Sequence, residues 1–222
     1  MFPKYQQIYL IVFFFADRDI KPENCLLDDD GTAILTDFGS VALAQVRLDK
    51  RRDALLLQDH AATHSTMTYR APELWDPPPE ISTINTTKAD VWALGCLLWA
   101  MAFGYSPFEA EFPSSKSQYI KPRLVETSHL RVLATPPTPP LDSLPNVQQT
   151  SPQFFQSVLD ASRLLLVLDP TERPHIDHVL DISANRLVAL ASLHSSVPSF
   201  SSSARGCGGS TSPHHDDPDP ER

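Results

Sequence analysis

Glycine is scarce in this chain, and its few positions exclude one common kind of phosphate-binding loop. The 222 residues contain seven glycines, at positions 31, 39, 95, 104, 206, 208 and 209. No set of them forms G-x-G-x-x-G, the pattern that lets a backbone approach phosphate closely. The sequence as given therefore contains no glycine-rich loop of that type.

Cysteine is equally sparse. Cys25, Cys96 and Cys207 form no C-x-x-C pair. An odd number of such isolated cysteines indicates neither a disulfide framework nor a zinc site. We therefore expect a reducing compartment.

Basic runs and long apolar runs are also missing. The formal net charge is −9, which argues against nucleic acid as a partner because phosphate binding needs a basic surface. The apolar run from Ile8 to Ala16 is too short to cross a bilayer. With Lys4 ahead of it, the run does resemble a short signal-peptide core.

The patterns that are present predict a mainly α protein with one small β-hairpin, which is an α+β fold class. Residues 25–28 and 33–36 read as two strands, and Gly31 suits the turn between them. The segment 86–104 is apolar nearly all round, which indicates a buried helix that ends at Gly104. Further helices are expected at 51–64, at 153–168 and from about Pro174. A proline-rich loop is expected at 134–152.

Three motifs follow one another along the chain. The stretch D-R-D-I-K-P-E-N occupies 17–24, Asp37-Phe38-Gly39 follows the predicted hairpin, and Ala71-Pro72-Glu73 comes later. A lone Asp-Phe-Gly is usually only a turn, but this ordered set resembles the signature of the protein kinases. The resemblance implies a kinase fold and phosphoryl transfer from ATP to a protein.

The resemblance assigns catalytic roles to five residues, Asp19, Lys21, Asn24, Asp37 and Thr66. Asp19 takes the place of the carboxylate that accepts the proton of the substrate hydroxyl. Lys21, two residues further on, steadies the transferring phosphoryl oxygens. Thr66 stands five residues before Ala71, where the family's threonine bonds the catalytic aspartate. This lysine and threonine indicate the serine/threonine branch, so a protein substrate bearing Ser or Thr is expected.

The cofactors implied by the resemblance are ATP and Mg²⁺. Asn24 supplies an amide oxygen and Asp37 a carboxylate, and both suit a hard cation that prefers oxygen ligands. These two residues and Leu26 are the expected contacts to the nucleotide and its metal.

Three further residues are expected to be structural. Glu73 resembles the glutamate that pairs with an arginine near the C-terminal helices, and Arg173 in D-P-T-E-R-P is the matching arginine. Asp90, at the start of the buried helix, is expected to tie down the backbone of the catalytic loop.

The activation segment, the segment 87–109 and the stretch L-V-L-D-P-T-E-R-P-H-I resemble the Numb-associated kinase group. This implies a cytoplasmic kinase of membrane traffic, located at endomembranes through peripheral association of the full-length protein. Phe2 stands where an acylated glycine would be needed, so the lipid anchor known in the group is not expected at this terminus.

The sequence departs from the family pattern before Arg18. A kinase places a small lobe ahead of its catalytic loop, and here sixteen residues precede Asp17. We therefore expect a non-matching segment at 1–16, a kinase C-terminal lobe at 17–193 and a disordered tail at 194–222. The run Ile11–Phe15 resembles a translated intron end, and we hypothesise that the small lobe is encoded upstream. A mature transcript that reads through these codons would contradict this hypothesis.

Asp17 is a second departure, because the family usually has histidine there, packed on the Phe of Asp-Phe-Gly. We expect a carboxylate to pack poorly beside Phe38. We also expect an exposed apolar face where a small lobe would pack.

Two alternatives to an active protein kinase stay open. One is an inactive pseudokinase lobe that binds partners. The other is a small-molecule phosphotransferase of related fold, against which Lys21 and the Ala-Pro-Glu segment argue.

Overall fold

The computed structural model describes residues 15–79, 82–112, 122–136, 138–139 and 152–181. The chain divides into two compact units, Met1–Asp181 and Ile182–Arg222, and every described residue belongs to the first. The predicted tail at 194–222 lies outside the described residues, as do residues 1–14 and most of the proline-rich loop. Within the described part, no helix combines the length and the apolar character needed to cross a membrane.

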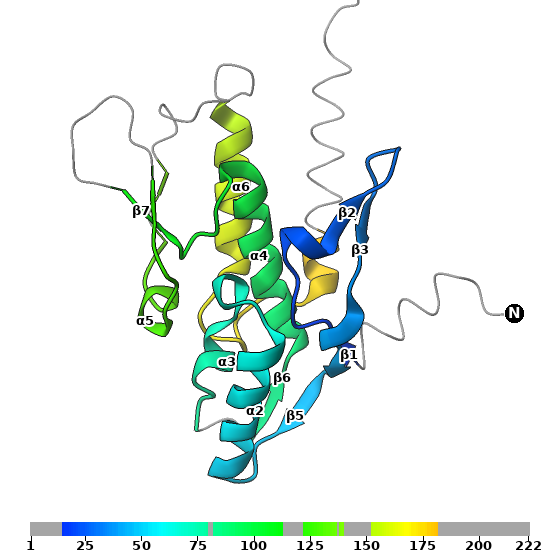
Figure 1. The fold of residues 1–222 in the computed structure, drawn as a ribbon, viewed down its shortest axis with the longest axis vertical. Coiled ribbons are helices and arrows are strands. Elements are labelled where there is room, and N and C mark those ends of the chain that lie inside the picture. The colour runs from blue at the N-terminus through cyan, green and yellow to red at the C-terminus, as the bar shows by residue number, and fades with distance from the viewer. Residues whose placement is uncertain (1–14, 80–81, 113–121, 137, 140–151, 182–222) are drawn as a thin grey trace, which may run out of the picture. The chain divides into compact units, whose positions relative to one another are not determined.

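The longer helices lie where the sequence predicts them (Figure 1). The predictions over 51–64, 86–104 and 153–168 correspond to α2, α4 and α6, and residues 176–181 are also helical, close behind Pro174. The single-turn helices α3 and α5 and the 3₁₀ turns were not predicted, because one turn shows no periodicity. The bounds are α2 (Arg51–His64), α3 (Pro72–Trp75), α4 (Thr87–Phe103), α5 (His129–Val132), α6 (Pro152–Leu165), η1 (Pro22–Asn24), η2 (Phe38–Ser40) and η3 (Met67–Tyr69).

The strands form four antiparallel pairs in the described residues, of which only the β2–β3 hairpin was predicted. Gly31, with φ +79°, lies in the turn of that hairpin. The other strands have two or three residues each, too few to show alternation, so the prediction of a single hairpin was incomplete. The pairs are β1 (Phe15–Ala16) with β4 (Ala42–Leu43), β2 (Cys25–Leu27) with β3 (Ala33–Leu35), β5 (Gln45–Arg47) with β6 (Thr83–Asn85), and β7 (Ala110–Glu111) with β8 (Arg123–Leu124).

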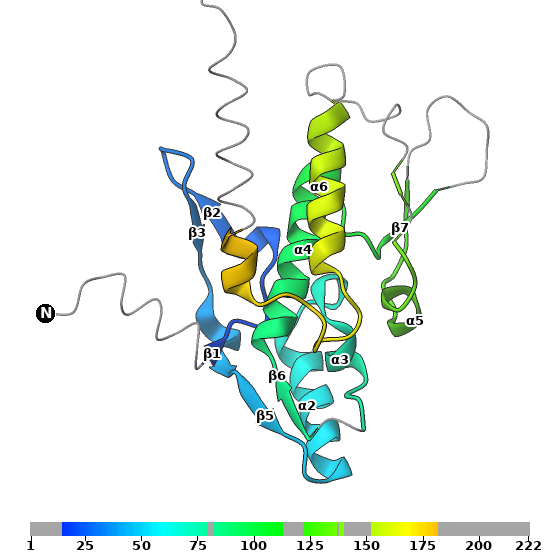
Figure 2. The same ribbon diagram turned by 180° about the vertical axis from the view of Figure 1, so that it is seen from behind.

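Helix α4 is the centre of the core, and α6 packs along it (Figures 1 and 2). The buried residues of α4 lie on all sides of the helix, as expected for an apolar helix without a polar face. Gly95 permits the close approach of α6, because a Cβ there would lie 2.9 Å from Cβ of Leu165. Gly104 ends the helix in the left-handed conformation with φ +81°. The predicted buried helix and its glycine stop are both confirmed.

Replacing Gly95 by valine should separate α4 from α6. We expect the free energy of unfolding to fall by about 1–3 kcal/mol, since the added side chain overpacks this contact. Met101→Val is the matched control, because Met101 is exposed on the same helix and should cost less than about 1 kcal/mol. Chemical denaturation measures both, and equal losses for the two variants would contradict the contact.

Candidate active site

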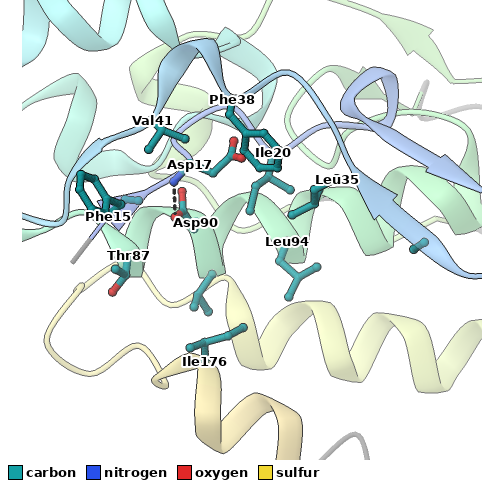
Figure 3. Close-up of a pocket in the computed structure, with 13 residues that line it drawn as sticks. Phe15, Asp17, Ile20, Leu35, Phe38, Val41, Thr87, Asp90, Leu94 and Ile176 are labelled. Carbon is teal, nitrogen blue, oxygen red and sulfur yellow. Dashed lines mark hydrogen bonds between the residues drawn. The ribbon is translucent and has the colours of Figure 1, made fainter. Parts of the chain in front are cut away.

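The backbone of the catalytic loop is held by a carboxylate of α4. Asp90 accepts hydrogen bonds from the backbone N–H of Asp17 at 2.9 Å and of Arg18 at 2.8 Å, and Figure 3 shows the first of these. Arg18 has φ +70°, a left-handed conformation that costs free energy for a residue with a side chain. The two bonds to Asp90 support that conformation, so the loop takes its shape from the start of α4.

Asp90 and the neighbouring Asp17 both have raised pKa values. Burial raises the pKa of Asp90 to about 7, against the two backbone N–H donors, which lower it. Burial also raises the pKa of Asp17, and the nearby charges of Asp19 and Asp37 add to that rise. Asp17 nevertheless has a structural role, because its carboxylate accepts a hydrogen bond from the backbone N–H of Asp19 at 3.1 Å.

The carboxylate of Asp19 lies at the centre of a network that joins two distant segments. Its Oδ2 accepts from Nζ of Lys21 at 2.7 Å. Its Oδ1 accepts from both the backbone N–H and the hydroxyl of Thr66, at 2.8 and 2.7 Å. The Thr66 hydroxyl in turn accepts from Lys21 at 2.9 Å. The structure thus brings three of the five predicted catalytic side chains, Asp19, Lys21 and Thr66, into direct contact.

These contacts keep the Asp19 carboxylate charged. Partial burial alone would raise its pKa, but hydrogen bonds from Lys21 and Thr66 outweigh burial and lower the pKa below its usual range. A carboxylate with a lowered pKa is a weak base. It suits a reaction in which orienting the attacking hydroxyl matters more than removing its proton early.

In sequence, Asn24 comes directly before the β2–β3 hairpin and Asp37 comes shortly after it. The buried Asn24 donates its amide N–H to the backbone carbonyl of Asp19 at 3.0 Å, which leaves its amide oxygen as the atom it can offer a cation. Asp37 is exposed, has φ +58° and accepts a weak hydrogen bond from the backbone N–H of Gly39 at 3.3 Å. Leu26, the remaining predicted nucleotide contact, is an exposed residue of β2.

These residues fit Mg²⁺ only in company with a nucleotide. Within the described ranges, no three His, Cys, Asp or Glu side chains gather as a metal-binding group. Magnesium, however, is usually held by one or two carboxylates together with substrate phosphates and water. One amide oxygen and one carboxylate therefore match a metal that arrives bound to ATP.

The predicted pair of Glu73 and Arg173 is present and fully buried. Two guanidinium nitrogens of Arg173 donate to the two carboxylate oxygens of Glu73, at 2.7 and 3.0 Å. Arg173 also donates to the backbone carbonyl of Lys88 at 2.6 Å, and its guanidinium lies 5.1 Å from the ring centre of Trp92. One side chain therefore joins α3, the start of α4 and the segment after α6.

An apolar cavity of about 510 Å³ lies beside the catalytic loop (Figure 3). Asp17 and Phe38 both line it, together with Leu94 of α4 and Ile176. Phe38 is 61% exposed, in keeping with the poor packing expected beside a carboxylate. The hairpin exposes apolar side chains on both of its faces. The exposed apolar residues around it are Phe15, Leu26, Leu27, Ile34, Leu35, Phe38 and Leu43.

Arg18 is a site residue to which the sequence assigned no role. Its Nε donates to the backbone carbonyl of Ser40 at 3.1 Å, and its Nη2 lies 3.5 Å from Nε2 of His60 on α2. Burial lowers the pKa of His60, and the charge of Arg18 lowers it further. The adjacent Asp19 was the only signal for Arg18 in the sequence, and His60 had none.

Breaking the buried pair should be far more costly than breaking an exposed one. We expect Arg173→Met to lower the free energy of unfolding by about 3–5 kcal/mol, because Glu73 is left buried and unpaired. Arg163→Met is the control, since Arg163 is half exposed and 3.9 Å from Asp160, and should cost about 0–1 kcal/mol. Urea denaturation measures both. A double variant Glu73→Leu/Arg173→Met that lost as much as the two single variants together would contradict the pairing.

The network around Asp19 should also stabilise the fold in a pH-dependent way. Because the folded pKa is depressed, the stabilisation is present above the unfolded value of about 3.9 and is lost as pH falls through the lower folded value. Lys21→Met removes one cause of the depression. We expect the stability difference between wild type and Lys21→Met to shrink as pH falls below about 4. A difference in unfolding free energy that is independent of pH would contradict a charged Asp19–Lys21 contact.

Comparisons with known proteins agree with this geometry. The family model described as "Protein kinase domain" matches residues 8–183. The chain is 34% identical over 166 residues to serine/threonine-protein kinase 16 of Mus musculus and of Homo sapiens, which covers 75% of this chain and 47% of each relative. It is 38% identical over 154 residues to a probable serine/threonine-protein kinase of Dictyostelium discoideum, covering 69% of this chain and 37% of that relative.

The chain spans about half the length, or less, of these relatives. The family match nevertheless covers more than half of the chain, including the Asp19 network, the Asp37 turn and the Glu73–Arg173 pair. With its α+β architecture and relatives that are named serine/threonine-protein kinases, the chain belongs to the protein kinase family.

Proposed function

We propose that the described residues are the C-terminal lobe of a serine/threonine kinase of the Numb-associated group. The reaction is transfer of the γ-phosphoryl group of ATP to a Ser or Thr hydroxyl of a protein. The observation that carries this proposal is the Asp19 carboxylate, which is held by Lys21 and by Thr66 from a separate segment. A lobe used only as a scaffold has no need of this arrangement.

Asp19 is proposed to orient the substrate hydroxyl and to accept its proton as the phosphoryl group transfers. Oδ1 accepts two hydrogen bonds from Thr66. Oδ2 accepts one from the Lys21 ammonium and a long one, at 3.4 Å, from the Asn24 amide. Oδ2 is therefore the oxygen proposed to accept the substrate hydroxyl. Lys21 is placed to offset negative charge on the transferring oxygens while it steadies Asp19. Catalysis of this kind relies on position and charge more than on strong bases.

Asn24 and Asp37 are proposed to hold Mg²⁺ bound to ATP, and Leu26 to contact the nucleotide from the exposed surface of β2. Magnesium, when bound, neutralises charge on the phosphates. Two hydrogen bonds keep Asn24 in place. Its side-chain amide donates to the backbone carbonyl of Asp19, and its backbone carbonyl accepts from the N–H of Thr36 at 2.9 Å.

The proposed setting is the cytoplasm, at endomembranes, through peripheral association of the full-length protein. This part of the proposal rests on the resemblance of the segments 87–109 and 166–176 to the Numb-associated group. The domain division proposed with it is a segment at 1–16, the kinase lobe at 17–193 and a tail at 194–222.

A second candidate function is partner binding by a catalytically inactive lobe. The observation that favours it is the exposed apolar surface of the hairpin, where Leu27 is 66% exposed and Leu26 54% exposed. Large apolar patches on soluble proteins usually mark interaction sites. The intact Asp19 network favours the active enzyme over this alternative.

The test is phosphoryl transfer by the full-length protein that carries this sequence. We expect Asp19→Asn to lower transfer from ATP to a mixture of Ser- and Thr-containing peptides by about 10²–10⁴-fold, the usual contribution of a positioned acid or base. Asp59→Asn, an exposed position on α2, should leave the rate unchanged. A wild-type protein that binds protein partners but shows no transfer above the level of Asp19→Asn would favour the inactive lobe.

A further inference from the structure

We propose that Asp17 is a positioning residue for phosphoryl transfer, acting through the catalytic Asp19. This role rests on the proposed function and extends it to a residue outside the reacting groups. Asp17 stands where the resemblance to the kinases leads one to expect histidine, so its contacts belong to this chain and not to the family pattern. Its Oδ1 accepts a hydrogen bond from the backbone N–H of Asp19 at 3.1 Å.

Three consecutive backbone N–H groups of the catalytic loop donate to two carboxylates. Those of Asp17 and Arg18 donate to the two carboxylate oxygens of Asp90, and that of Asp19 donates to Asp17. Asp90 therefore fixes the loop as far as Arg18. The bond that continues this arrangement to the catalytic residue is made by Asp17.

The hydrogen bond made by Asp17 spans a strained residue. Arg18 lies between the two partners and has a φ of +70°. A residue with a side chain keeps such a conformation only where the surrounding structure determines it. An aspartate that accepts from the N–H two residues further on favours a turn of the backbone locally. Asp17 therefore supports the same turn from within the loop that Asp90 supports from α4.

The backbone and the side chain of Asp19 are held by different groups. Lys21 and Thr66 contact the carboxylate, whereas Asp17 contacts the N–H. The backbone sets the direction in which the side chain leaves the loop, and hence where Oδ2 meets the substrate hydroxyl. A displacement of about 1 Å in a reacting group can lower a rate about 10²-fold. Loss of the contact to Asp17 is therefore expected to act on the rate of transfer.

The contact requires an acceptor oxygen and not a negative charge. The side-chain amide of asparagine carries such an oxygen, so Asp17→Asn can keep the hydrogen bond. Leucine has a similar size and no acceptor. It suits the site in other respects, because Asp17 lines the apolar cavity beside the catalytic loop together with Leu94 and Ile176 (Figure 3). The two substitutions thus separate the hydrogen bond from the volume of the side chain.

The test compares these two variants in the full-length protein that carries this sequence, with Ser- and Thr-containing peptides as substrates. We expect Asp17→Leu to lower kcat about tenfold, which corresponds to about 1.4 kcal/mol. The KM for ATP should change less than about twofold, because the lost interaction acts on the reacting group and not on nucleotide binding. Asp17→Asn should restore kcat to within about twofold of wild type.

Asp169 provides a matched control, because it makes the same kind of turn elsewhere in the chain. Its Oδ1 accepts from the backbone N–H of Thr171, two residues further on, at 2.8 Å. Asp169→Leu should leave kcat unchanged although it removes the same kind of hydrogen bond. Urea denaturation establishes that each variant is folded. If Asp17→Leu does not fold, Asp17→Ala removes the acceptor with less bulk and takes its place.

Two results obtained with an active wild-type protein would overturn the role of Asp17. One is an unchanged kcat in the folded variant that lacks the acceptor. The other is an equal loss of kcat in Asp17→Asn and Asp17→Leu, which would mean that the acceptor oxygen is not what matters. A wild-type protein without any transfer would instead contradict the proposed function, and this role with it.

Discussion

The attachment of the catalytic loop to α4 is the constraint on which the site depends. Asp90 holds two consecutive N–H groups of the loop, and without them Arg18 would have little reason to keep a left-handed backbone. Asp19 follows Arg18 directly, so the position of its carboxylate depends on a residue of the central helix. Arg173 reaches the same helix through the carbonyl of Lys88. Both the reactive loop and the Ala-Pro-Glu segment are therefore positioned relative to the start of α4.

The negative charge of Asp19 is balanced by groups in direct contact with it and not by the charge of the chain as a whole. The chain as a whole is acidic, with a net charge of −9, yet Asp19 stays ionised because one ammonium and one threonine meet it at short range. Asp17 and Asp90 lie close by with raised pKa values. Burial is the main cause of both raised pKa values, and for Asp17 the nearby charges of Asp19 and Asp37 add to it.

The sequence predicted contacts well where motif spacing is specific and poorly where geometry alone decides. Glu73 and Arg173 are one hundred residues apart in sequence and were paired from their motifs alone, as were Asp19 and Thr66. Helix α4 could be predicted because a long apolar run with a terminal glycine allows few structures. The pairing of β5 with β6 could not be predicted, because three residues have no detectable period. The contact of Arg18 with His60 depends on three-dimensional packing, which no local pattern encodes.

The β2–β3 hairpin has a consequence for how this surface can be covered. Leu26 and Ile34 are cross-strand partners and share one face, whereas Leu35 and Leu27 belong to the opposite face. Ala33 and Leu35 also line the cavity beside α4. A single flat partner can bury only one face of a two-stranded ribbon. Complete shielding of this hairpin from water therefore requires cover on both faces, over the outer surface and on the side of the cavity beside α4.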